Sequence, residues 1–147
     1  MQASGRKIAT GHSAVAGLVT WIVAWAIIAW ALPLEGAAAQ QGNVEDGAEV
    51  FKKCRACHDV GPDAKNKVGP PLNDVIGRTA GAVAQFSYSD ANKAAGAKGL
   101  VWNDDTLSKY LENPLAFMPG TKMAFAGLKD PQDRKDLIAY LKTFSKK

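Results

Sequence analysis

Cysteine and histidine are scarce in this chain of 147 residues, which contains two of each. Both cysteines, Cys54 and Cys57, lie in one short stretch, so the sequence has no disulfide framework. Of the histidines, His12 lies in an apolar N-terminal leader and His58 directly follows Cys57. A structural zinc site needs four ligands of the cysteine or histidine type, and the chain after the leader offers three. These counts argue against a disulfide-stapled or zinc-stabilised protein.

Two further patterns are missing. No stretch sustains the alternation of apolar and polar residues that is typical of strands. The lysines are scattered singly, and no platform of arginine and aromatic residues is present, so we expect no nucleic-acid partner. The formal net charge of +4 is moderate and favours acidic protein surfaces or anionic lipids as partners.

The residues Cys54-Arg55-Ala56-Cys57-His58 have the spacing of a c-type haem attachment motif. Two thiols at this spacing can add to the two vinyl groups of the porphyrin, and His58 can then bind the iron from the proximal side. The adjacent histidine distinguishes this pattern from a thioredoxin-like redox pair, which needs no ring nitrogen there. The motif predicts one covalent haem c.

A second axial ligand cannot be a histidine of the same domain, because His58 is the last one in the chain. Methionine is the natural candidate. After Met1, only Met118 and Met123 remain, both in stretches expected to be loop, and spacing alone does not choose between them.

The first part of the chain resembles a leader rather than part of a fold. Basic residues at 6–7 precede an apolar stretch over 14–34, and the alanines at 37–39 offer a cleavage site. We predict a signal peptide over 1–39 and an exported, periplasmic domain over 40–147. The alternative is a retained inner-membrane anchor, because a stretch of this length can span a bilayer. Tryptophans favour the interfaces of a membrane, and this stretch contains Trp21, Trp25 and Trp30.

Three helices are predicted in the domain. The first begins at the N-cap Asn43 and runs into Cys54, the second lies between the N-cap Asn103 and Pro114, and the third begins at Asp130-Pro131. Their expected apolar faces are Val44, Ala48 and Phe51; Leu107, Tyr110 and Leu111; and Leu137, Ile138, Leu141 and Phe144.

Long loops separate these helices. Residues 59–71 carry turn formers without periodicity, and residues 72–101 are rich in glycine and alanine. Such a chain leaves a thin core, which a large apolar cofactor would fill. Gly47 lies on or beside the first apolar stripe, where it is either simply tolerated or allows another helix to cross closely.

The domain resembles the class I cytochromes c, most closely the mitochondrial and the alphaproteobacterial periplasmic types, and the match runs from Gly47 to the C-terminus. The segments that carry the resemblance are 54–58 (CRACH), 67–73 (KVGPPLN), 76–78 (IGR), 86–93 (FSYSDANK), 110–114 (YLENP), 119–123 (PGTKM) and 136–141 (DLIAYL). The resemblance implies an all-α fold of helices and Ω-loops around one haem, with the first and last helices crossing at Gly47 and Phe51 packed against Leu137 and Tyr140.

The resemblance also implies roles for individual residues. Met123 is implied as the sixth iron ligand, Met118 as a packing residue, and the Pro70 carbonyl as the acceptor for the free ring N–H of His58. Two further groups are implied: propionate partners Arg78, Tyr88 and Trp102, and a polar cluster near the methionine formed by Asn92, Tyr110 and Thr121.

The implied function is that of a soluble, monomeric one-electron carrier, not an enzyme, between a cytochrome bc complex and a terminal oxidase or reaction centre. A membrane-tethered carrier is the first alternative. A haem peroxidase or sensor is another, and it would need a displaceable sixth ligand. The docking lysines implied by the resemblance are Lys53, Lys65, Lys67, Lys122 and Lys129. Two family lysines are replaced by Leu115 and Ala116, so this ring is thinner.

Overall fold

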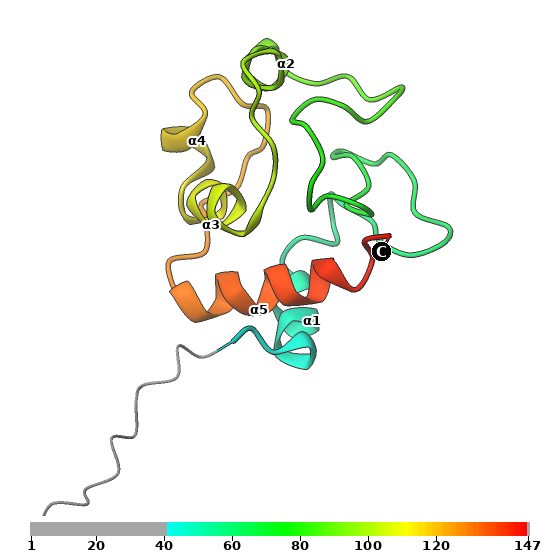
Figure 1. The fold of residues 1–147 in the computed structure, drawn as a ribbon, viewed down its shortest axis with the longest axis vertical. Coiled ribbons are helices and arrows are strands. Elements are labelled where there is room, and N and C mark those ends of the chain that lie inside the picture. The colour runs from blue at the N-terminus through cyan, green and yellow to red at the C-terminus, as the bar shows by residue number, and fades with distance from the viewer. Residues whose placement is uncertain (1–40, 147) are drawn as a thin grey trace, which may run out of the picture. The chain divides into compact units, whose positions relative to one another are not determined.

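The computed structural model describes residues 41–146, and within that range five helices are joined by long loops (Figure 1). The helices are α1 (Val44–Phe51), α2 (Asp90–Ala97), α3 (Asp104–Glu112), α4 (Pro114–Phe117) and α5 (Pro131–Lys142). Within residues 41–146 the only strand-like pairing is an isolated bridge between Thr79 and Val101. The fold is therefore all-α, as predicted.

Two sequence predictions fall outside the described range. The signal peptide predicted over 1–39 and the alternative membrane anchor over 14–34 both lie before residue 41. Among the helices of residues 41–146, none combines the length and the apolar character needed to cross a bilayer.

The three predicted helices begin where the capping residues indicated. The Asn43 side chain accepts hydrogen bonds from the backbone N–H groups of Glu45 and Asp46, at 2.8 and 3.2 Å. Asn103 and Thr106 form a reciprocal capping box at the start of α3. Asp130 caps α5, whose first residue is a proline. These caps satisfy N–H groups that a helix leaves free at its start.

Two short helices were not predicted from the sequence. Helix α2 buries none of its residues, so it has no apolar stripe that a periodicity search could find. Helix α4 begins at Pro114, which was expected only to end α3. Asn113 serves both helices, because its extended backbone ends α3 while its side chain caps α4 by accepting from Ala116 N–H at 3.2 Å.

Helices α1 and α5 cross closely at Gly47, and Figure 1 shows them against each other. A Cβ atom at Gly47 would overlap the Asp136 carbonyl oxygen and lie 2.7 Å from Tyr140 Cβ. Next to this contact, the rings of Phe51 and Tyr140 are 5.4 Å apart. The close crossing is therefore the reason for the glycine, and simple tolerance is excluded.

The ends of these two helices differ from the predicted apolar faces. Val44 is exposed, and the buried residues of α1 are Gly47, Val50 and Phe51, because the face against α5 is centred on the glycine. Helix α5 ends at Lys142, so Phe144 lies in the turn beyond it. From there its half-buried ring packs edge-on against Tyr140 at 5.0 Å.

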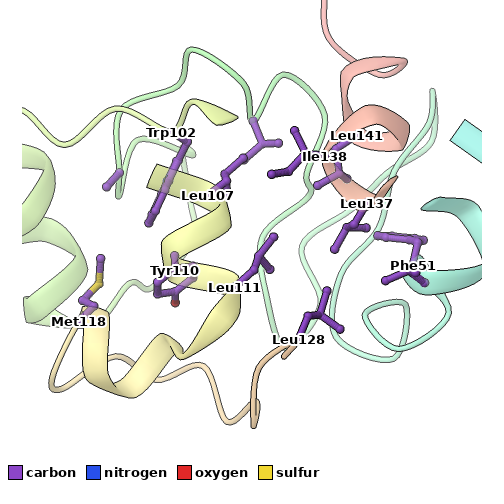
Figure 2. Packing of buried hydrophobic residues seen from close by; sticks show 13 residues of the cluster. Phe51, Trp102, Leu107, Tyr110, Leu111, Met118, Leu128, Leu137, Ile138 and Leu141 are labelled. Atoms are coloured by element: carbon purple, nitrogen blue, oxygen red, sulfur yellow. The ribbon is translucent and has the colours of Figure 1, made fainter. Parts of the chain in front are cut away.

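The buried side chains of α3 and α5 meet in one cluster, with α1 at its edge (Figure 2). Leu107, Tyr110 and Leu111 come from α3, and Leu137, Ile138 and Leu141 from α5. A second contact holds the same helices together at the surface, where the Lys142 ammonium lies 2.5 Å from the Asp104 carboxylate. The α1–α5–α3 arrangement fixes the position of the turn that follows α1.

Replacement of Gly47 by alanine is expected to lower the free energy of unfolding by about 1–3 kcal/mol, because the added methyl group has no room beside the Asp136 carbonyl. Chemical denaturation of the haem-loaded protein measures this. The matched control is Glu49→Ala at an exposed position of the same helix, which should change that free energy by less than ~0.5 kcal/mol. Equal stability of both variants and the parent would contradict a tight crossing.

Candidate functional site

The Cys54–His58 motif forms a tight turn directly after α1. Cys54 N–H donates to the Phe51 carbonyl at 2.8 Å, and His58 N–H donates to the Cys54 carbonyl at 3.0 Å. A later loop returns to this turn, because Gly69 N–H donates to the Cys57 carbonyl at 2.8 Å. The motif is thus held from one side by α1 and from the other by the segment that contains Pro70.

The ring of His58 is fixed in orientation and in tautomer. Its Nδ1 lies 2.8 Å from the Pro70 carbonyl oxygen, which can only accept, so Nδ1 carries the proton. Burial is the main cause that lowers the pKa of His58, and the ring is therefore neutral near pH 7. A neutral ring protonated at Nδ1 presents an unprotonated Nε2, the atom that a metal would bind.

A cavity of about 290 Å³ lies beside this histidine. Its walls are mainly apolar and include Leu72, Val75, Leu107, Leu137 and Leu141. All the candidate site residues predicted from the sequence also line it: Cys54, Cys57, His58, Pro70, Arg78, Tyr88, Asn92, Trp102, Tyr110, Thr121 and Met123. The fold thus brings together around one space residues that span 70 positions of the chain.

The two cysteines differ in environment. Cys54 is half-buried, and burial raises its pKa to about 11, so its sulfur is uncharged at neutral pH. Cys57 is exposed. An uncharged sulfur at an apolar wall is compatible with a thioether, which carries no charge, and it makes Cys54 a poor thiolate nucleophile once the domain has folded.

Arg78 is one of the polar residues of the cavity wall. Its guanidinium Nη1 donates to the carbonyl oxygens of Asn73 and Pro71, at 2.9 and 3.2 Å. Burial lowers the pKa of Arg78 and raises that of Tyr88, which also lines the cavity. A half-buried cation beside a phenol is a favourable place for a carboxylate that enters the cavity.

Asn92 is a second polar group of the cavity wall. Within the described part of the chain, its Oδ1 is one of two buried side-chain polar atoms that form no hydrogen bond. Buried polar atoms are normally paired, and an amide oxygen can only accept, so this one calls for a hydrogen-bond donor such as a bound water. The apolar walls, together with the donors Arg78 and Tyr88, fit a large flat group with acidic substituents.

Met123 and Met118 occupy different places. Met123 lines the cavity, and its backbone N–H donates to Thr121 Oγ1 at 3.3 Å. The same hydroxyl is 3.0 Å from the Tyr110 hydroxyl. Met118 does not line the cavity, is 5 % exposed, and packs in the core beside Tyr110, as Figure 2 shows.

Sequence reasoning gave no role to Gly69. A Cβ atom at this position would overlap the His58 ring, so the bare backbone of Gly69 is what allows the ring to lie against it. The available signal for this role in the sequence was a glycine directly before two prolines. Sequence reasoning also gave no role to Arg134, a buried cation of α5 that does not line the cavity.

A helical domain that surrounds an apolar cavity, with a Cys-x-x-Cys-His turn in its wall, defines a c-type cytochrome. The family model described as "Cytochrome c" matches residues 44–145. Cytochrome c2 of Afifella marina is 54% identical over 101 residues, which cover 69% of this chain and 82% of that protein. Cytochrome c of Gibberella zeae is 55% identical over 106 residues, which cover 71% and 97%.

The solved structure of cytochrome c2 from Rhodospirillum centenum superposes with a TM-score of 0.69 at 48% identity, covering 71% of this chain and all of that one. The chain belongs to the cytochrome c family, and its fold is that of class I. Members carry one covalently attached haem c, and Cys54 and Cys57 fit its attachment motif. They are electron-transfer proteins and not enzymes.

The protein without haem is expected to be largely unfolded, because the cavity lies in the middle of a small core and would leave Leu107, Leu137 and Leu141 unsupported. Circular dichroism during heating of a Cys54→Ala/Cys57→Ala variant, purified without haem, measures this against the haem-loaded parent. A cooperative melt of the haem-free variant near that of the parent would contradict the expectation.

Proposed function

We propose that this chain is a periplasmic one-electron carrier whose haem iron is bound by His58 and Met123. The single observation that carries the proposal is that Met123 and the unprotonated Nε2-bearing ring of His58 line the same cavity as both cysteines. When bound, haem supplies Fe(II)/Fe(III) exchange of one electron. The chain's own residues bind it, set its surroundings and exclude other ligands.

The ligand pair supports a carrier rather than a peroxidase or a gas sensor. The two side chains that would hold the iron are an imidazole and a thioether, and neither is charged, which would favour the reduced state. Thr121 and Tyr110 restrain the backbone on which Met123 lies, through contacts of 3.3 and 3.0 Å. With both side chains on the iron, oxygen and peroxide would find no open place to bind.

Arg78, Tyr88 and Trp102 are proposed to bind the haem propionates. One cation and two neutral donors lower the cost of burying two carboxylates in a mainly apolar cavity. Asn92 is proposed to belong with Tyr110 and Thr121 to the polar cluster near Met123. Its Oδ1 forms no hydrogen bond and can only accept, so its partner in this cluster would be a donor.

Five exposed lysines are proposed to orient the domain on acidic faces of a cytochrome bc complex and of a terminal oxidase or reaction centre: Lys53, Lys65, Lys67, Lys122 and Lys129. Lys53 and Lys122 line the cavity, so positive charge does lie at its rim. Four of the five have local partners. Lys53 lies 3.0 Å from Asp133, and Lys67 lies 3.7 Å from Asp59. Lys122 donates to the Ser87 carbonyl at 3.3 Å, and Lys129 donates to the Glu112 carbonyl at 2.7 Å.

The surface of α4 differs from this pattern, since Leu115 is 57% exposed where the family has a lysine. The steering field is therefore weaker on that side, and partner recognition there depends on apolar contact.

Replacement of Met123 by alanine is expected to abolish the near-infrared sulfur–iron band of the oxidised protein. It should also lower the reduction potential by roughly 0.1 V or more, because axial ligands set haem potentials over a wide range. The matched control is Met118→Ala, which should keep the band because Met118 packs in the core away from the cavity. Loss of the band in Met118→Ala alone would reverse the assignment.

The rate constant for oxidation by an acidic partner, such as a purified terminal oxidase, is expected to fall about tenfold or more as ionic strength rises from low to physiological values. Lys65→Ala should lower the rate at low salt, because Lys65 belongs to the proposed docking set. Lys98→Ala, which removes an exposed charge outside that set, should leave it nearly unchanged. A rate that is independent of salt would refute electrostatic steering.

N-terminal sequencing of the exported protein is expected to begin at Gln40, because cleavage after the alanines at 37–39 removes the leader. Fractionation accompanies it, and the protein should be released with the periplasmic contents. A chain that retains residues 14–34 and sediments with membranes would establish the tethered alternative instead.

A further inference from the structure

Met123 lies on a short segment that has little structure of its own. Residues 122–127, the Met123 strap, form no helix, and within the described part of the chain their backbone groups make no hydrogen bond to other backbone groups. Met123, Ala124 and Phe125 of this strap line the cavity. The position of the strap therefore depends on how its two ends are attached.

The near end of the strap is attached through Thr121. Its Oγ1 contacts the Tyr110 hydroxyl at 3.0 Å and accepts the N–H of Met123 at 3.3 Å. Lys122 adds a hydrogen bond to the Ser87 carbonyl at 3.3 Å. These contacts join the near end to α3 and to the loop before α2.

The far end of the strap lies against the C-terminus of α3. Leu128 N–H donates to the Leu111 carbonyl at 2.7 Å, and the Lys129 ammonium donates to the Glu112 carbonyl at 2.7 Å. Gly127 has a φ of +93°, and a Cβ atom there would overlap the Glu112 carbonyl oxygen. The far end thus needs both the left-handed backbone and the bare glycine.

Arg134 of α5 also holds the far end of the strap. Its Nη1 donates to the carbonyl oxygens of Leu128 and Lys129, at 2.7 and 3.1 Å. Its Nε donates to Ser108 Oγ on α3 at 3.1 Å. One guanidinium therefore joins α5, α3 and the end of the strap.

The charge of Arg134 is not explained by an ion pair. The residue is 8% exposed, and its Nη2 lies 3.8 Å from the carboxylate of Glu112, which is itself mostly exposed. Burial of a cation is costly, and here its short hydrogen bonds go to neutral carbonyl and hydroxyl oxygens instead. What these bonds hold in place is the end of the strap.

We propose that Arg134 is a positioning residue for Met123. It fixes the far end of the strap to α3 and α5, and so holds the thioether in the cavity wall without touching the cavity itself. This inference rests on the proposed ligation of the iron by Met123. Loss of the Arg134 bonds releases the far end and lets Met123 leave its position more often.

The experiment compares haem-loaded Arg134→Gln and Arg134→Lys with the parent protein. Two properties are measured in the oxidised state: the intensity of the near-infrared sulfur–iron band and the dissociation constant of added imidazole, which competes with Met123. Arg134→Gln is expected to bind imidazole about tenfold or more tightly, because hydrogen bonds from a charged group are lost. Arg134→Lys, which keeps the charge but loses the planar fork, should lie between.

Ile138→Ala is the matched control, because Ile138 is buried on the same helix and does not line the cavity. It should lower the free energy of unfolding without changing the imidazole affinity. Gly127→Ala is a second variant at the same attachment, and it carries the test if Arg134→Gln does not retain haem. It should increase imidazole affinity in the same way as Arg134→Gln.

Parental imidazole affinity in both Arg134→Gln and Gly127→Ala would overturn the proposal, and so would an equal change in Ile138→Ala. Failure of the ligand assignment gives a different result. In that case the parent itself lacks the sulfur–iron band, and Met123→Ala leaves imidazole binding unchanged, so the inference falls together with the proposed function.

Discussion

The rest of the structure depends on the close contact between α1 and α5 at Gly47. Without a side chain on Gly47, the Asp136 carbonyl and Tyr140 approach the α1 backbone directly, and Phe51 packs beside them. The Cys54–His58 turn begins where α1 ends, so this contact decides where both sulfurs and the imidazole lie. A second polar contact fixes the start of α1, since the buried Asp136 carboxylate accepts the N–H of Asn43 at 2.7 Å.

A few backbone and side-chain contacts hold the functional side chains of the cavity in place. The Pro70 carbonyl fixes the tautomer of His58, and Gly69 leaves room for its ring. Thr121 contacts one end of the strap that carries Met123, and Arg134 contacts the other end. These contacts restrain side chains that line the cavity.

Much of this could be predicted from the sequence because its signals are local. Each helix start is indicated by one capping side chain, that of Asn43, Asn103 or Asp130. The haem motif is five consecutive residues. The sequence alone left Met118 and Met123 undecided, and that choice came from the family resemblance, because it depends on which residue reaches a cavity formed by distant segments.

Each structural feature that could not be predicted from the sequence has a physical reason. Helix α2 buries no side chain, so no apolar period marks it. The burial of Arg134 cannot be predicted from a helix stretch whose neighbouring residues are polar. Two of its three hydrogen-bond partners are carbonyl oxygens, which every residue has. Val44 is exposed because the helix face is set by a glycine, which hydrophobic patterns do not register.

The contact between α1 and α5 also has a consequence for biogenesis. Its partners are some 90 residues apart in the chain, so α1 lacks its packing partner until α5 has been made. During that interval Cys54 and Cys57 lie on an unfolded chain, and burial has not yet raised the pKa of Cys54. Late closure of the two terminal helices thus leaves a time window in which the cofactor can be attached.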